Sequence, residues 1–222
     1  MSKPKKITKN YNLSDEKMHE EANVKHNALK TDIAEFAAFD PKFTNEYVEI
    51  FSTKINSAQE AVTDNVIIDQ LAAKTVAVET AMDSCRKKYR SVKYFVESAF
   101  KDNKAVQNEF GFNDYKPARS TQIKMIAFIK QLGISAMRYQ TELTAAGMTE
   151  ESINEIETLG NELNSANDEQ EDFKKQRTLL TQSRTILNNE VYEIVKEIAR
   201  AGKIVFEDNP AKYAIYILVD MK

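Results

Sequence analysis

One stretch of sequence decides the fold: residues 149–202 read TEESINEIETLGNELNSANDEQEDFKKQRTLLTQSRTILNNEVYEIVKEIARAG. It contains no proline, and Gly160 is its only internal glycine. Apolar side chains recur along it every three and four residues, which is the spacing of one face of an α-helix. At ~1.5 Å per residue such a helix would span roughly 80 Å, far more than an ordinary globular helix. We therefore predict one very long helix near the C-terminus.

The heptad repeat of this helix supplies two columns that face a core. The first column contains Ile156, Leu163, Gln170, Arg177, Arg184, Val191 and Ile198. The second column contains Leu159, Ala166, Phe173, Leu180, Leu187, Ile194 and Ala201. An unpaired buried guanidinium is costly. The polar run Gln170, Arg177 and Arg184 therefore predicts a register-setting polar layer, an exposed stripe, or a groove that binds an anion or a partner.

Arg177 and Arg184 need carboxylates or water around them, because a guanidinium stays charged at physiological pH. The acidic run on the same helix ends at Asp172, outside the three- or four-residue reach of Arg177. We therefore expect the partners to come from the first or second helix of the chain. The candidates are Glu20, Asp32, Glu46 and Glu49.

The remaining sequence is also helical, which predicts an all-α fold: an elongated, antiparallel, coiled-coil-like helical bundle. Residues 1–13 are predicted to form a flexible basic tail, and residues 14–222 a single domain. Thr63-Asp64-Asn65 is either a tight turn or an exposed point inside one helix, and the absence of glycine and proline favours continuity. The expected helices cover residues 15–39, 42–64, 66–101, 121–146, 150–203 and 210–218, with an irregular connection at 102–120.

The composition of the chain argues against several classes of protein. The chain has 222 residues and a formal net charge of −3, which gives no electrostatic reason to bind nucleic acid. Its one cysteine, Cys85, rules out an intramolecular disulfide and lies on a helical core stripe, so we expect a buried, inert thiol. The start of the chain lacks an apolar signal segment, and no window is long and apolar enough to span a membrane. We expect a cytoplasmic protein.

No catalytic or metal-binding constellation is complete. A carboxylate-bridged di-iron bundle needs two Glu-x-x-His pairs. Glu16 and His19 match this pattern once, whereas His26 has Asn23 three residues before it. The glycines are isolated, so there is no phosphate-binding loop. We therefore expect neither an enzyme nor a bound cofactor.

Charge is unevenly distributed between two blocks. Residues 149–172 hold nine acidic residues and no basic residue. A basic cluster lies on the third helical segment and contains Arg86, Lys87, Lys88, Arg90 and Lys93. Each block is either a solvated face or part of a matched pair that selects the packing partner, as flanking charges do in coiled coils.

Two segments carry a resemblance to a known group of proteins. Gln107-Asn108-Glu109-Phe110-Gly111 and the stretch from Ile204 to Lys212, IVFEDNPAK, resemble a family of uncharacterised bacterial helical proteins. The resemblance lies mainly in residues 100–215. It implies a bacterial helical bundle and no particular activity.

These observations favour a non-enzymatic structural or interaction protein, a helical bundle that self-associates or scaffolds a protein partner. The helix expected at 121–146 is much shorter than the long helix, so the rest of the apolar stripe must pack on the first helices or on another chain. An alternative is a membrane-active protein resembling the helical pore-forming toxins, with Ile123–Met137 as the inserting segment. That segment contains Lys124 and Lys130 and is too short for a full span, so a membrane role is less favoured. A metal-binding bundle of carboxylates and histidines is the third reading.

Overall fold

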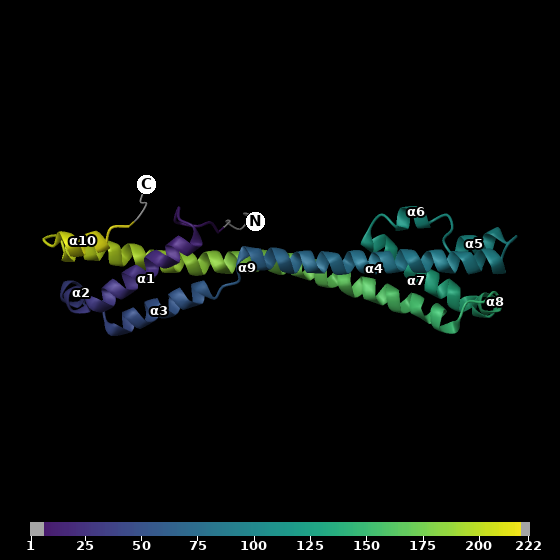
Figure 1. The fold of residues 1–222 in the computed structure, drawn as a ribbon, viewed down its shortest axis with the longest axis horizontal. Helices are drawn as coiled ribbons and strands as arrows, with labels where there is room; N and C mark the ends of the chain where they lie inside the picture. The colour runs from purple at the N-terminus through teal and green to yellow at the C-terminus, as the bar shows by residue number, and fades with distance from the viewer. Residues whose placement is uncertain (1–6, 219–222) are drawn as a thin grey trace, which may run out of the picture. The chain divides into compact units, whose positions relative to one another are not determined.

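The computed structural model of the protein describes residues 7–218, and within that range every regular element is a helix (Figure 1). This confirms the prediction of an all-α helical bundle with a very long helix. The ten helices are α1 (Asp15–Thr31), α2 (Ile33–Phe39), α3 (Asn45–Gln59), α4 (Asp64–Ala99), α5 (Lys104–Glu109), α6 (Tyr115–Ala118), α7 (Gln122–Arg138), α8 (Gln140–Ala145), α9 (Glu150–Val205) and α10 (Pro210–Ile215).

Several helix ends follow directly from local sequence. A side-chain oxygen that accepts a bond from the backbone N–H three residues ahead satisfies one of the free donors of a helix N-terminus. Six residues of the described chain cap helices in this way: Ser14, Thr44, Asn103, Thr121, Thr149 and Asn209. Gly147 lies between α8 and α9 with a φ of 101°, a conformation that suits glycine and ends the preceding helix.

The helices are interrupted at three points where the prediction favoured a continuous helix. The helix expected at 15–39 is broken at Asp32, whose buried carboxylate binds side chains of the C-terminal region. The helix expected at 121–146 is broken at Tyr139. The continuity favoured at Thr63-Asp64-Asn65 is wrong, because α3 ends at Gln59 and α4 begins at Asp64. This break presents the Val62 carbonyl and the Asp64 carboxylate to Arg184.

The single domain expected for residues 14–222 is divided into two compact units. Unit 1 comprises Met1–Asp64 and Arg177–Lys222, and unit 2 comprises Asn65–Gln176. Helix α9 contributes its first part to unit 2 and its second part to unit 1. The physical reason is visible along α9 itself, where the six side chains from Lys174 to Leu179 are exposed and belong to neither core.

The core of unit 1 lies between α1, α3, α10 and the C-terminal part of α9 (Figure 1). Its largest fully buried side chains include Met18, Leu29, Phe36, Phe51 and Tyr216. Residues 7–13 also join this unit, although a flexible tail was predicted. Their contacts include the buried ring of Tyr11 and hydrogen bonds between Asn189 and the backbone of Thr8 and Asn10. Residues 1–6 of that predicted tail lie outside the described part of the chain.

The core of unit 2 lies between α4, α7 and the N-terminal part of α9, with α5, α6 and α8 around it. It is built from aliphatic and aromatic side chains, among them Val92, Met125, Ile129, Leu132 and Leu163. These side chains form the apolar faces of three helices. Burying such faces against one another stabilises the helices more than their intrinsic helix propensity does.

Each unit places an aromatic ring against a glycine. In unit 1 the ring of Tyr216 lies on α9, and a Cβ at Gly202 would be 2.3 Å from the nearest ring carbon. Gly202 therefore allows the ring of Tyr216 to pack closely against α9. The helix does not end near Gly202 but continues to Val205. In unit 2 a Cβ at Gly111 would be 2.3 Å from the ring of Phe128. Gly111 also has a φ of 75°, so its lack of a side chain serves both the turn and the packing.

Candidate functional site

Gln170 is buried in unit 2 and forms a satisfied polar contact. Its Nε2 donates to the Thr75 hydroxyl at 2.9 Å, and its Oε1 accepts from Lys174 at 3.1 Å. A buried amide with a partner on the facing helix fixes the register of two helices. Gln170 therefore acts in packing α9 against α4.

Arg184 is buried in unit 1 and has acidic partners on other elements. Its guanidinium donates to Asp64 at 2.6 Å and to the Val62 carbonyl at 3.3 Å, and lies 3.7 Å from Asp15. The hydrogen bond with Asp64 raises the pKa of Arg184 further above its ordinary value. The sequence correctly required partners from another helix, but none of the four candidate acids is one of them.

Arg177, on the same column, is exposed and forms no ion pair with any described residue. The expectation of a partner for Arg177 is therefore wrong. Its position is part of the exposed stretch Lys174–Leu179 between the two cores, where no element covers the column. The polar run predicted as one site is thus three separate environments, and it does not form a groove lined by all three residues.

A polar network surrounds Arg184. The Tyr11 hydroxyl donates to Asp15 at 2.7 Å, and the Nε2 of His19 lies 2.8 Å from the Oδ1 of the buried Asn188. Burial raises the pKa of Asp15, but hydrogen bonds from Lys9 and Tyr11 outweigh it, and the net shift is downward. Because its charged members have partners inside unit 1, this network has the character of a structural polar layer.

The basic cluster of α4 divides into an inward and an outward part. Lys88 is buried, and its ammonium donates to Ser152 at 2.7 Å and to Glu155 at 2.6 Å. At this point the basic block does meet the acidic block of α9, as one reading of the charges predicted. Three other members, Arg86, Lys87 and Arg90, line a different surface, and Lys93 lies 3.6 Å from the Glu97 carboxylate on the same helix.

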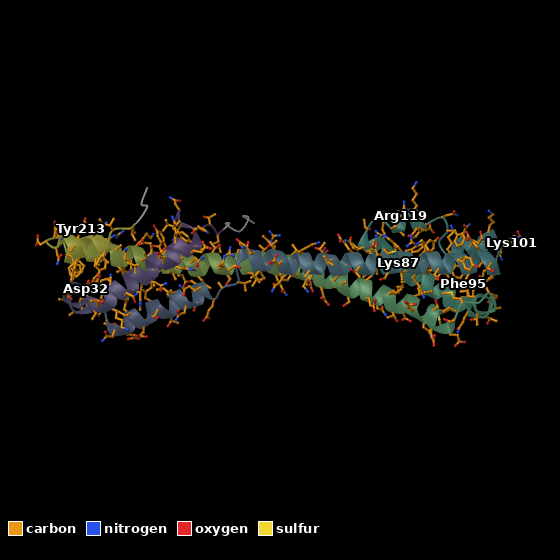
Figure 2. The ribbon with its side chains drawn as sticks, viewed as in Figure 1. Asp32, Lys87, Phe95, Lys101, Arg119 and Tyr213 are labelled. Atoms are coloured by element: carbon orange, nitrogen blue, oxygen red, sulfur yellow. The ribbon has the colours of Figure 1, made fainter. Side chains whose placement is uncertain are left out.

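That surface is a concavity of about 690 Å³ on unit 2, between α4 and the segment that begins with α6. We call it the basic concavity. Its charged lining consists of Asp83, Arg86, Lys87, Arg90, Lys116 and Arg119. Figure 2 shows Lys87 on α4 and Arg119 just after α6. Lys116 and Arg119 were not among the predicted site residues, because they fall in the connection predicted to be irregular.

A second surface of unit 2 is an apolar groove of about 610 Å³ between α7 and α9, called here the α7–α9 groove. Its apolar lining includes Ile126, Ile134 and Met137 of α7 and Ile153 and Ile156 of α9. Ile134 and Met137 are 49% and 53% exposed. The groove also contains one cation, Lys130 on α7, and one carboxylate, Glu157 on α9.

Cys85 is fully buried in unit 2, as expected from the core stripe. Its Sγ lies 3.5 Å from the Leu159 carbonyl oxygen. Burial raises the pKa of the thiol to about 11, so the nucleophilic thiolate is scarce near neutral pH.

Residues 7–218 contain neither a metal-binding cluster of side chains nor a membrane-spanning helix. No group of three or more histidine, cysteine, aspartate or glutamate side chains in this range is arranged to hold a metal ion. His26 packs against the ring of Phe51, with 5.8 Å between ring centroids. None of the helices in this range is both long and apolar enough to cross a membrane.

Comparisons with protein-family models, with curated proteins and with solved structures give no match to this chain.

Proposed function

We propose that the protein is a non-enzymatic interaction protein, a helical bundle that self-associates through the α7–α9 groove of unit 2. The observation that carries the proposal is the pair of opposite charges in a groove whose other lining residues are apolar side chains, two glycines and the uncharged Asn154, Asn161 and Asn164. Lys130 and Glu157 are exposed, lie on different walls, and form no ion pair within residues 7–218.

The apolar lining of the groove supports an association driven by burial. Ile134 and Met137 lie about half exposed beside Ile126, Ile153 and Ile156. Covering such side chains is favourable by ~25 cal/mol per Å² of apolar surface. A contiguous apolar patch with polar groups at its edge is typical of a protein interface.

Two glycines shape the groove. A Cβ at Gly160 would lie 3.1 Å from Ile129, and a Cβ at Gly133 would lie 3.6 Å from Ile156. The two helices can therefore approach each other closely, and the floor between them carries no side chain at either glycine. A ridge of side chains from a partner helix fits such a depression.

The charges favour a second copy of the same chain as the occupant. In a two-fold symmetric interface, residue i of one copy contacts residue j of the other, and the reverse contact forms as well. Lys130 of each copy would then meet Glu157 of the other copy. One groove thus supplies both halves of two equivalent ion pairs, which a partner of arbitrary sequence would not do.

The oligomeric state in solution tests this proposal. We expect sedimentation equilibrium of the wild-type protein to show a concentration-dependent dimer. Met137→Asp should weaken dimerisation because it places a charge in the apolar groove. Ile123→Asp is the matched control, since Ile123 lies on the same helix, is 74% exposed and does not line the groove.

A charge exchange tests the symmetry of the contact. Lys130→Glu and Glu157→Lys should each weaken the dimer, whereas the double variant should restore it, because opposite charges again face each other. A wild-type protein that stays monomeric at high concentration would refute the proposal. So would a dimer that both Met137→Asp and the two charge variants leave unchanged.

A further inference from the structure

The basic concavity of unit 2 concentrates positive charge in a chain whose formal net charge is −3. Five of its six charged lining residues are cations. They come from two elements far apart in the sequence, α4 and the segment starting at α6. The fold itself therefore assembles this concentration of charge, which no single stretch of sequence contains.

The only carboxylate of the concavity is already engaged. Asp83 accepts a hydrogen bond from Arg86 at 2.6 Å, and the other terminal nitrogen of Arg86 donates to the Arg119 carbonyl at 3.2 Å. Arg86 thus joins the end of α6 to α4 and has a structural role. It also holds the backbone of Arg119 beside α4, which positions the second wall of the concavity.

Four cations remain: Lys87 and Arg90 on one wall, and Lys116 and Arg119 on the other. All four are exposed, and none forms an ion pair with a carboxylate of residues 7–218. Within each wall the two cations are three residues apart, a spacing at which helical side chains are neighbours and like charges repel. Their neighbour Lys88 shows the contrasting arrangement, because it turns inward and binds Glu155 at 2.6 Å.

We infer that the basic concavity binds a compact anion that carries several phosphate groups. A guanidinium presents a planar fork of donors that matches phosphate oxygens, and a lysine adds a mobile point charge. Each wall of the concavity supplies one arginine and one lysine. The volume of about 690 Å³ falls in the range of small-molecule sites and exceeds the needs of a single inorganic ion.

The rest of the lining suits a compact ligand whose phosphate groups are attached to an organic group. The ring of Tyr115 is half-buried and stacks on Tyr89, with 4.1 Å between ring centroids, which gives the concavity a rigid apolar part. The Ser120 hydroxyl donates to the Pro117 carbonyl at 2.7 Å and so fixes the backbone next to Arg119. The site is independent of the α7–α9 groove, since the two have no lining residue in common.

Calorimetric titration with sodium tripolyphosphate at low ionic strength tests the inference. We expect saturable binding and a rise in the thermal unfolding midpoint, because a ligand that binds only the folded state stabilises it. The variant Arg90→Ala/Arg119→Ala removes one guanidinium from each wall and should weaken binding by about tenfold or more, since each lost bond was made to a charged group. The matched control is Lys101→Ala/Lys104→Ala, which removes the same charge from exposed positions of unit 2 outside the concavity.

A second arm separates the two sources of clustered phosphate. Phosphatidylcholine vesicles with and without phosphatidylinositol bisphosphate are sedimented with the protein. Retention on the phosphorylated vesicles, lost in the Arg90→Ala/Arg119→Ala variant, identifies a lipid headgroup as the source. Tripolyphosphate binding without retention identifies a soluble anion.

Three outcomes would overturn the inference. The first is that neither tripolyphosphate nor the phosphorylated vesicles bind. The second is that the alanine pair in the concavity binds as well as the lysine control, which indicates unspecific attraction. The third is that polyglutamate binds and tripolyphosphate does not, which assigns the concavity to an acidic protein segment. A far-ultraviolet circular dichroism spectrum of each variant checks that the variant is folded. None of these three outcomes tests the proposed dimer, because the dimer contact lies in the α7–α9 groove.

Discussion

The two units both rest an aromatic ring on a glycine, but they hold the ring in different ways. In unit 1 the ring of Tyr216 lies on Gly202, and its hydroxyl donates to Asp32 at 2.7 Å. Asp32 in turn accepts from Lys212 at 2.7 Å. In unit 2 the ring of Phe128 lies on Gly111 and has no polar group. It is held by the neighbouring rings of Tyr89 and Tyr115, whose centroids are 5.0 and 5.7 Å away.

The difference shows two means of closing a helical core. Unit 1 buries Asp32, Lys25 and Arg184 and gives each a polar partner. Such contacts specify one arrangement, because a displaced helix would leave a buried charge without its partner. Unit 2 closes around Phe128 mainly through shape and through a turn that requires glycine. The closure around Phe128 should therefore be sensitive to added volume, whereas the buried charge of unit 2, Lys88, lies elsewhere and is paired with Glu155.

The largest expected effect comes from adding a methyl group at Gly111, and the same change at Gly202 is its counterpart in unit 1. Gly111→Ala should destabilise by about 3 kcal/mol, since overpacking costs about 1–3 kcal/mol and the left-handed backbone adds about 1–2 kcal/mol. Gly202→Ala should cost about 1–2 kcal/mol, because alanine gains back about 1 kcal/mol of helix propensity. Urea unfolding followed by circular dichroism measures both.

Gly133→Ala is the control for this pair. Its Cβ would be 3.6 Å from Ile156, an ordinary contact, and the residue lies inside α7. We expect no loss of stability and a gain of up to ~1 kcal/mol from helix propensity. A loss at Gly133 as large as that at Gly202 would show that the ring contacts are not what distinguishes these glycines.

The next effect concerns the polar closure of unit 1. Asp32→Ala should cost about 2–3 kcal/mol, because it leaves the buried Tyr216 hydroxyl without an acceptor. Glu35→Ala removes the other carboxylate near Lys212, but this residue is exposed and should cost under ~0.5 kcal/mol. Combining Asp32→Ala with Tyr216→Phe should cost less than the sum of the two, since the hydroxyl is then absent. Simple additivity in urea unfolding would contradict the proposed role of this contact.

The smallest effect is a loss of stability of unit 1 in acid. A hydrogen bond from Lys42, joined by one from Tyr47, lowers the pKa of Glu197 despite partial burial, and the pKa of Asp15 is lowered as well. A carboxyl group with a lowered pKa stabilises the fold above its unfolded pKa of about 4, and this contribution is lost as pH falls through the folded pKa. The urea midpoint should therefore decrease below about pH 4. The double variant Asp15→Asn/Glu197→Gln should show a flatter decrease, whereas Glu79→Gln, an exposed residue of unit 2, should follow the wild type.

Periodicity predicted much of the fold because it acts over a few residues. Every member of the first column of α9 except Arg177 is buried. Periodicity identifies the residues that share a face of a helix. It does not say where along the helix the covering elements end, so it left open whether Arg177 lies in a polar layer, on an exposed stripe or in a groove.

The missed features depend on contacts between distant parts of the sequence. No local pattern connects Asp32 with Tyr216, or brings Lys116 and Arg119 to α4. The break before Asp64 has no glycine or proline, and its role depends on Arg184, far along the chain. Lys88 is different, because it follows Cys85 by three residues on the same stripe. Its inward position could have been predicted from that spacing.

The exposed stretch Lys174–Leu179 is a favourable site for limited proteolysis. A protease needs locally unwound backbone, and unwinding here breaks helical hydrogen bonds without opening either core. Trypsin has three sites in this stretch: Lys174, Lys175 and Arg177. Cleavage after Arg177 would separate a short C-terminal fragment that carries the rest of α9 and α10. That fragment would remain docked on α1 and α3 without a peptide bond, so unit 1 is organised as a complementation pair of two polypeptide fragments.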